Sequence, residues 1–209
     1  RKEFDPSAFK IDYAKELNAD QLVVVQDGEG PTLVIAGAGS GKTRTLVYRV
    51  AYLIERGVRP ENILLVTFTN KAAKEMLFRV ERLLGTFPQG LWGGTFHHVA
   101  NILLRKYAKR IGFSNNFSIL DQEDARALTK VIVKDLGIDA KARRFPSPAV
   151  IQSILSLAAN TERTITETIE VFRSAYIDVT PDMERINTAY RERKLRNNQM
   201  DFDDMLVYL

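Results

Sequence analysis

The sequence contains no cysteine, which excludes disulfide bonds, thiolate metal sites and cysteine nucleophiles. Long apolar runs are absent too, since Leu22 to Val25 and Leu33 to Ala36 are far shorter than the ~18 residues that cross a bilayer. We therefore expect no membrane partner and a reducing compartment, with the cytoplasm as the location. The first residues hold neither Met nor an apolar signal core, so we expect a cut or processed start and a longer parent protein.

The composition is that of an ordinary folded protein. Of 209 residues, 45% are hydrophobic and 27% charged, which disfavours disordered and collagen-like classes. The formal charge of +4 permits an acidic partner without requiring one. The basic residues gather in three clusters, which are either solvated helix faces or contacts for DNA: Arg105, Lys106, Lys109 and Arg110; Lys141, Arg143 and Arg144; Arg191, Arg193, Lys194 and Arg196.

Strand and helix patterns alternate in the first part of the chain. A strand over 33–36 leads through glycines into a helix over 42–55, and a strand over 63–68 leads into a helix that Thr69 caps and Gly85 ends. A third short strand is expected near 91–95. Such alternation predicts a parallel sheet with helices on its faces, hence an α/β fold.

The second part of the chain predicts helices with no convincing strand between them. The expected ranges are 99–111, 121–136, 148–159, 166–176 and 181–197. Ser147-Pro148 and Thr180-Pro181 each combine an N-cap residue with proline at the first helical position. Met183, Ile186, Ala189 and Tyr190 share one face of the last of these helices, which is therefore expected to be buried.

A phosphate-binding loop stands between the first strand and the helix over 42–55. Its glycines let backbone N–H groups approach phosphates, Lys42 can reach the β and γ phosphates, and Thr43 can ligate Mg²⁺. Ala36 replaces the first glycine of the strict pattern, at a position that requires only a small residue. The expected ATP and Mg²⁺ ligands are Ala36, Gly37, Ala38, Gly39, Ser40, Gly41, Lys42 and Thr43, with Lys42 and Thr43 as the catalytic members.

Four short motifs in order carry a family resemblance: Leu17 to Gln21, the phosphate-binding loop, Thr67 to Ala73, and Gly94 to His97. Together they closely resemble the UvrD/Rep/PcrA family of superfamily 1 DNA helicases. The tail, Met200 to Leu206, is similar to the segment that closes the family's inserted helical subdomain. The resemblance covers nearly the whole chain, from about residue 17 to residue 209.

The resemblance implies a fold and a division of the chain. We expect an incomplete RecA-like P-loop NTPase sheet, subdomain 1A, interrupted by an inserted all-helical subdomain 1B. The expected boundaries are an N-terminal extension over 1–16, the first part of 1A over 17–100, 1B over 101–200, and a return segment toward 1A over 201–209.

The resemblance also assigns roles to single residues. Gln21 would bind adenine, although its spacing from Asn18 also fits a helix capping box. Arg44 would contact the nucleotide. Single-stranded DNA would stack its bases on aromatic faces and accept polar contacts at its phosphates. The residues that would bind it are Phe68, Thr69, Asn70, Lys71, Thr95, Phe96 and His97. Without the resemblance, Phe68 and Phe96 could equally be core residues at strand ends, and Trp92 is expected to pack rather than to bind DNA.

Hydrolysis in such motors needs an acidic pair at the end of an apolar strand, and no such pair is found. Asp203 and Asp204 follow Arg196 to Gln199 rather than a buried strand, so we expect them to begin a helix. In the family the acidic motif comes shortly after this tail. We therefore expect the chain to bind nucleotide and DNA weakly and to hydrolyse little ATP.

The parent protein is expected to be an ATP-dependent 3′ to 5′ DNA helicase and translocase of repair or replication, acting on single-stranded DNA and on single/double-strand junctions. Three alternatives stay open. They are the helicase subunit of a helicase-nuclease, a P-loop kinase of small metabolites, and a non-catalytic DNA-binding module. The kinase interpretation leaves the motifs around Phe68 and Phe96 unexplained.

Overall fold

The computed structural model describes residues 9–139 and 145–209. The chain divides into two compact units, of which unit 1 ends at Val99 and unit 2 begins at Ala100. The boundary falls within helix α5 (Phe96–Tyr107). The basic cluster of Lys141, Arg143 and Arg144, and residues 1–8 of the expected N-terminal extension, lie outside the described residues.

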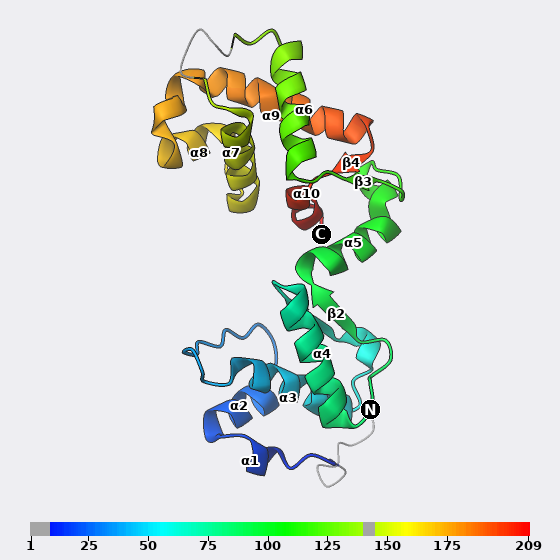
Figure 1. Cartoon of the computed structure of the whole chain (residues 1–209). Coiled ribbons are helices and arrows are strands. Elements are labelled where there is room, and N and C mark those ends of the chain that lie inside the picture. The colour runs from blue at the N-terminus through cyan, green and yellow to red at the C-terminus, as the bar shows by residue number, and fades with distance from the viewer. Residues whose placement is uncertain (1–8, 140–144) are drawn as a thin grey trace. The chain divides into compact units, whose positions relative to one another are not determined.

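Unit 1 combines helices with a small parallel sheet (Figure 1). Its elements are α1 (Tyr13–Glu16), α2 (Ala19–Asp27), α3 (Lys42–Glu55), the 3-10 turn η2 (Pro60–Asn62), β1 (Leu64–Thr67), α4 (Asn70–Leu84) and β2 (Trp92–Thr95). Strands β1 and β2 pair in parallel, with Leu64 opposite Trp92 and Thr67 opposite Thr95. The predicted strands near 63–68 and 91–95 are thereby confirmed, whereas α1 had no prediction and α2 was indicated only by the capping-box spacing of Asn18 and Gln21.

Local sequence signals set the ends of helices α3 and α4. Helix α3 has the predicted bounds, and α4 begins after Thr69, whose hydroxyl accepts a hydrogen bond from the Ala72 N–H at 3.2 Å. Gly85 ends α4 with a φ of 76°, a left-handed conformation that glycine adopts without steric cost. The buried side chains between α3, α4 and the strands form one apolar core: Val47, Val50, Ile63, Leu65, Met76, Val80 and Leu91.

The predicted strand over 33–36 is wrong, because the structure has no strand there. Leu33 is 85% exposed and Ile35 is 89% exposed. A strand gains stability from hydrogen bonds to a neighbouring strand and from cover over its apolar faces. In the described part of unit 1 only β1 and β2 pair with each other, so this segment has neither.

A cluster of aromatic side chains joins α1 to α3. The Tyr13 ring meets the Tyr52 ring edge-on at 5.3 Å and the Tyr48 ring at 6.1 Å between centroids. The Tyr13 hydroxyl donates a 2.7 Å hydrogen bond to Glu55 at the end of α3, and burial is the main cause that raises the pKa of Tyr13. Because Tyr13 is almost wholly buried, α1 is held firmly against α3.

Unit 2 is mostly helical, as predicted (Figure 1). After α5 come η3 (Ala108–Ile111), β3 (Ser118–Ile119), α6 (Gln122–Asp135), α7 (Pro148–Thr161), α8 (Ile165–Phe172), η4 (Ser174–Val179), α9 (Thr180–Arg196), β4 (Gln199–Met200) and α10 (Phe202–Val207). The apolar face predicted for α9 is confirmed, since Met183, Ile186 and Tyr190 are buried in a core that α6, α7, α8 and α9 share. The Ser147 cap on α7 is confirmed as well.

Three details of unit 2 differ from the sequence prediction. Strands β3 and β4, each of two residues, form a parallel pair between segments about 80 positions apart, too short and too distant for a local pattern. The expected helix over 166–176 ends at Phe172, because Arg173 leaves helical backbone geometry with φ −145° and ψ 40°. Thr180 does not cap α9; η4 runs directly into α9, so the Thr180 backbone is already helical.

Candidate nucleotide and nucleic-acid sites

The glycine-rich loop ends at the first turn of α3, and two of its glycines have left-handed backbone geometry. The φ angle is 78° at Gly39 and 85° at Gly41, the N-cap of α3. The φ angle of Gly41 favours glycine, and a Cβ atom there would lie 2.7 Å from the Gln21 Nε2 atom, at the end of a flexible side chain. The backbone N–H groups of the first turn of a helix lack partners within it and favour anions.

The Lys42 side chain lies over this loop. Its ammonium group donates hydrogen bonds to the carbonyl oxygens of Ala36 at 2.7 Å and of Gly37 at 2.6 Å. The Ser40 hydroxyl also donates to the Gly37 carbonyl, at 2.8 Å. Ala38 is exposed in the loop and Thr43 is exposed in the first turn of α3. The structure therefore places the ammonium group of Lys42 directly over the backbone of the loop.

Gln21 has two sets of contacts. It forms a capping box with Asn18 at the start of α2, and its Nε2 atom donates a 3.1 Å hydrogen bond to the Ser40 carbonyl of the loop. The capping alternative is thus present in the structure. The same side chain also faces the loop, so the cap leaves its amide beside Ser40.

Arg44 faces α1. Its Nη2 atom donates 2.8 Å hydrogen bonds to the carboxylate and to the backbone carbonyl of Glu16, and its guanidinium carbon lies 5.0 Å from the centroid of the Tyr48 ring. The Arg44 and Glu16 side chains are each 46% exposed. No local pattern in the sequence links Glu16 to Arg44, because 28 positions separate them.

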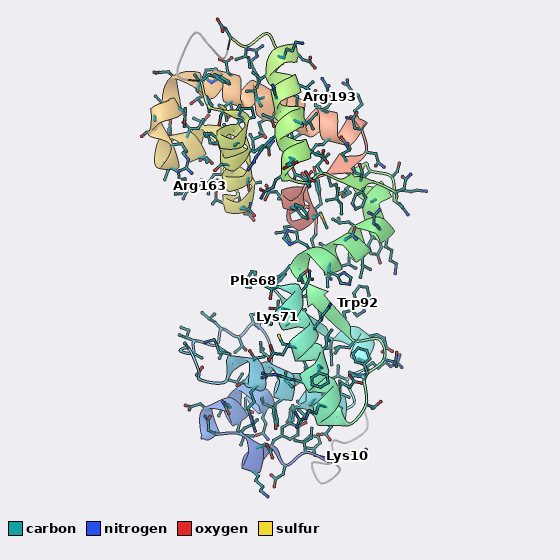
Figure 2. The ribbon with its side chains drawn as sticks, viewed as in Figure 1. Lys10, Phe68, Lys71, Trp92, Arg163 and Arg193 are labelled. Atoms are coloured by element: carbon teal, nitrogen blue, oxygen red, sulfur yellow. The ribbon has the colours of Figure 1, made fainter. Side chains whose placement is uncertain are left out.

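A second group of candidate residues lies where β1 and β2 end. Because the strands are parallel, Phe68 and Phe96 leave the sheet at the same edge, and their ring centroids are 5.5 Å apart. Phe68 is 89% exposed and Phe96 is 38% exposed, so they are not core residues. Figure 2 shows Phe68 and Lys71 at the beginning of α4.

The neighbouring polar residues begin the two helices. Thr69 caps α4, Asn70 and Lys71 are exposed in its first turn, and the Thr95 hydroxyl accepts a 3.2 Å hydrogen bond from the His98 N–H. His97 is partly buried in the first turn of α5. An exposed aromatic pair can stack on bases, and the N-terminus of a helix can bind phosphates.

Among the described residues, no three or more histidine, aspartate or glutamate side chains gather in a group that could hold a metal ion. A helix long and apolar enough to cross a membrane is likewise absent from the described part of the chain.

Comparison with known sequences places the chain in a family. A sequence model of the UvrD/REP helicase N-terminal domain matches residues 17–209. The chain belongs to this family. The resemblance drawn from the four motifs is thereby confirmed.

Similar proteins include three bacterial helicases, each called ATP-dependent DNA helicase PcrA. The identity is 40% over 196 residues for Staphylococcus epidermidis RP62A, 42% over 193 for Bacillus subtilis 168, and 37% over 192 for Staphylococcus aureus Mu50. These alignments cover 92%, 91% and 91% of this chain, and 26%, 25% and 26% of the respective relatives. The chain thus spans about a quarter of the length of these proteins.

Unit 2 contains a buried polar cluster that sequence analysis missed. The Lys194 ammonium, on a side chain only 6% exposed, forms 2.6 Å ion pairs with Asp201 and with Asp204. The Tyr190 hydroxyl donates to Asp201 at 3.0 Å. Asp203 and Asp204 lie in the first turn of α10, as predicted. The only sequence signal for the cluster is the four-residue spacing of Tyr190 and Lys194, which places both on one face of α9.

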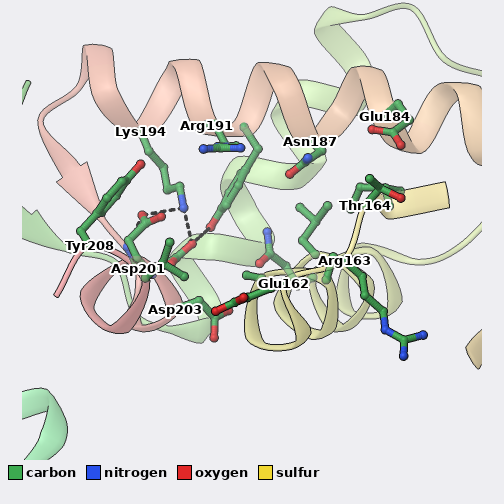
Figure 3. Close-up of a pocket in the computed structure, with 18 residues that line it drawn as sticks. Glu162, Arg163, Thr164, Glu184, Asn187, Arg191, Lys194, Asp201, Asp203 and Tyr208 are labelled. Carbon is green, nitrogen blue, oxygen red and sulfur yellow. Dashed lines mark hydrogen bonds and ion pairs between the residues drawn. The ribbon is translucent and has the colours of Figure 1, made fainter. Parts of the chain in front are cut away.

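This cluster forms part of the wall of a cavity of about 510 Å³ in unit 2 (Figure 3). Figure 3 shows Lys194 reaching from α9 toward Asp201, with Arg191 and Asn187 along the same helix. Burial is the main cause that raises the pKa of the Asp204 carboxyl, with Asp201 acting in the same direction and Lys194 opposing it. Burial also raises the pKa of Tyr190, so its hydroxyl stays protonated and donates.

Proposed function

We propose that this chain is the ATP-binding and single-stranded-DNA-binding portion of an ATP-dependent DNA helicase that translocates 3′ to 5′ in DNA repair or replication. Membership in the UvrD/REP helicase N-terminal domain family is the observation that carries the proposal. The likeness to PcrA helicases of three bacteria supports the helicase activity, which would belong to the whole protein.

The nucleotide would bind at the loop that precedes α3. Backbone N–H groups and Lys42 would hold the phosphates, Thr43 would share in binding Mg²⁺, and Gln21 and Arg44 would meet the adenine side. The contact of Gln21 with Ser40 supports this proposal, because it brings the amide to the loop independently of any ligand. Mg²⁺ would supply charge neutralisation on the β and γ phosphates when bound.

Single-stranded DNA, alone or beside a duplex junction, would bind the edge where β1 and β2 end. Phe68 and Phe96 would stack bases, while Thr69, Asn70, Lys71, Thr95 and His97 would contact phosphates. The exposure of Phe68 and its contact with Phe96 support this role, since the two rings present aromatic surface to solvent at one edge of the sheet.

We further propose that unit 1 supplies the first part of a RecA-like subdomain and that unit 2 is the inserted helical subdomain. The elements of unit 1 support this, because strands alternate with helices and the strands pair in parallel. The chain by itself would hydrolyse little ATP, since Asp203 and Asp204, the acidic pair that follows the two-residue strand β4, begin helix α10, and Asp204 is already paired with Lys194.

Binding titrations test the two sites separately. We expect Lys42→Ala to weaken binding of a fluorescent ATP analogue about 10-fold or more, the usual effect of losing hydrogen bonds from a charged group, and to leave single-stranded DNA binding within about twofold. We expect Phe68→Ala to weaken binding of a labelled oligo-dT about 5- to 150-fold and to leave ATP binding unchanged.

Phe78→Ala is the matched control, because Phe78 is 61% exposed on α4 and lies outside both candidate sites. DNA binding should fall as salt rises, because bound phosphates release counterions. Equal ATP affinity in wild type and Lys42→Ala, or the same loss of DNA affinity in Phe68→Ala and Phe78→Ala, would contradict the proposal.

A further inference from the structure

Glu16 lies where α1 ends, and α1 is fixed to α3 by the aromatic cluster. Tyr13, the first residue of α1, is 3% exposed and packs edge-on against Tyr48 and Tyr52. Its hydroxyl is tied to Glu55 on α3. The position of Glu16 relative to α3 is therefore set by buried contacts that do not involve Glu16 itself.

Glu16 in turn limits the motion of Arg44. The guanidinium group has three partners at once: the Glu16 carboxylate at 2.8 Å, the Glu16 carbonyl at 2.8 Å and the Tyr48 hydroxyl at 3.3 Å. The Tyr48 hydroxyl also donates to the same carboxylate at 3.0 Å, and burial raises the pKa of Tyr48, so this donor persists at neutral pH. A free arginine side chain has many rotamers, and these contacts have already removed much of that freedom.

Arg44 and Gln21 meet at Gly41. A Cβ atom built on Gly41 would lie 2.7 Å from the Gln21 amide nitrogen and 3.9 Å from the Arg44 Cβ atom. The Gln21 amide and the Cβ atom of Arg44 therefore border the end of the loop, whereas the Lys42 ammonium covers Ala36 and Gly37 at its beginning. With phosphates at Lys42, the group on the Arg44 side would be the base or sugar.

We propose that Glu16 is a positioning residue, which holds the Arg44 guanidinium ready to stack on the base of a bound adenine nucleotide. The inference rests on the proposed nucleotide site. A guanidinium plane stacks well on an aromatic face, and holding it in place beforehand lowers the entropy lost on binding. Glu16 therefore acts on the affinity for the base and not on the affinity for the phosphates.

Two ligands that share the triphosphate, one with and one without the nucleoside, separate this role from a structural one. We expect Glu16→Ala to weaken binding of a fluorescent ATP analogue about 3- to 10-fold, the usual effect of immobilising one side chain on binding. Inorganic tripolyphosphate, measured by competition, should bind wild type and Glu16→Ala within twofold of each other. Glu16→Gln keeps an acceptor oxygen and should lose less affinity than Glu16→Ala.

Two further variants complete the test. In Arg44→Ala, adding Glu16→Ala should cause no further loss of ATP affinity, because Glu16 acts through Arg44. Glu75→Ala removes a carboxylate of similar exposure that pairs with Arg79 on α4, and it should leave both affinities unchanged.

Unchanged ATP affinity in Glu16→Ala, an equal loss for ATP and tripolyphosphate, or additive losses in the double variant would overturn the role of Glu16. Failure of the nucleotide site itself gives a different result. Neither ligand would then bind the wild-type chain, or Lys42→Ala would bind both as well as wild type does.

Discussion

Two clusters of the same chemistry occur in the two units. In unit 1, Arg44, Glu16 and Tyr48 join a cation, a carboxylate and a phenol, and the ion pair is 46% exposed on each side. In unit 2, Lys194, Asp201, Asp204 and Tyr190 join the same kinds of group, but the Lys194 side chain is 6% exposed and the aspartates 12% and 14%. Both clusters place the tyrosine and the cation four residues apart on one helix.

Burial separates what the two clusters can do. Exposed ion pairs contribute about 0 to 1 kcal/mol to stability, whereas removal of one partner of a buried pair costs about 3 to 5 kcal/mol. The cluster of unit 2 joins α9 to the start of α10, and loss of its cation would leave two buried carboxylates unpaired. The cluster of unit 1 is half exposed and is therefore expected to contribute little to the free energy of unfolding.

The largest effect is expected from Lys194→Met. This change leaves two buried carboxylates without their cation, so unit 2 should lose about 3 to 5 kcal/mol of unfolding free energy. Hydrogen exchange of the α7 and α9 amides, beside urea unfolding, measures this loss. Arg193→Met is the control, since Arg193 pairs with Asp135 at 33% and 49% exposure and should cost about 1 kcal/mol or less. Equal losses in the two variants would contradict the comparison.

Removing the tyrosine hydroxyls gives a smaller contrast. Tyr190→Phe takes a hydrogen bond from a buried carboxylate and should cost about 1.5 to 3 kcal/mol, the range for bonds to charged groups. Tyr48→Phe takes one from the half-exposed Glu16, which water can then solvate, so about 0.5 to 1 kcal/mol is expected. Urea unfolding measures both losses. A larger loss for Tyr48→Phe than for Tyr190→Phe would contradict the conclusion that the buried cluster matters more for stability.

A pH series tests the buried carboxylate. Because the pKa of Asp204 is raised in the folded state, the folded protein binds its proton more tightly than the unfolded chain does. The stabilisation from this bound proton is present below the ordinary pKa of aspartate, and it is lost as pH rises through the pKa of Asp204 in the folded state. The unfolding free energy of Asp204→Asn should therefore fall furthest below that of wild type in acid. The difference between the two should shrink toward neutral pH. A gap that widens as pH rises would contradict this.

The smallest effect on stability is expected from Glu16→Ala. Its ion pair with Arg44 is half exposed, so the unfolding free energy should change by about 1 kcal/mol or less. The same variant is expected to change ATP affinity. A variant of the unit 1 cluster should thus change binding more than stability, whereas Lys194→Met should change stability most. A loss of stability comparable to that of Lys194→Met would make the unit 1 cluster a structural one.

Local signals made much of the fold predictable. The bounds of α3, the Thr69 cap, the Gly85 end of α4 and the Ser147 cap of α7 depend on residues within a few positions of one another. The strand over 33–36 failed because a strand depends on a partner elsewhere in the chain. The β3 and β4 pair was missed for the same reason, since two residues carry no periodicity.

The candidate sites divide in the same way. The phosphate-binding loop is contiguous in sequence, so its members could be named beforehand, and their roles stay predictions for binding experiments. The partner of Arg44 and the cation between Asp201 and Asp204 could not be named, because each depends on packing between elements. Buried or half-buried ion pairs formed across a fold carry no local pattern.

The most direct test of the proposed function is a titration of Lys42→Ala with a fluorescent ATP analogue and, on the same sample, with labelled single-stranded DNA. The proposal predicts that ATP affinity falls about 10-fold or more while salt-sensitive DNA binding persists, because the loop and the Phe68 edge are separate sites. Nucleotide binding that survives the loss of Lys42 would contradict it.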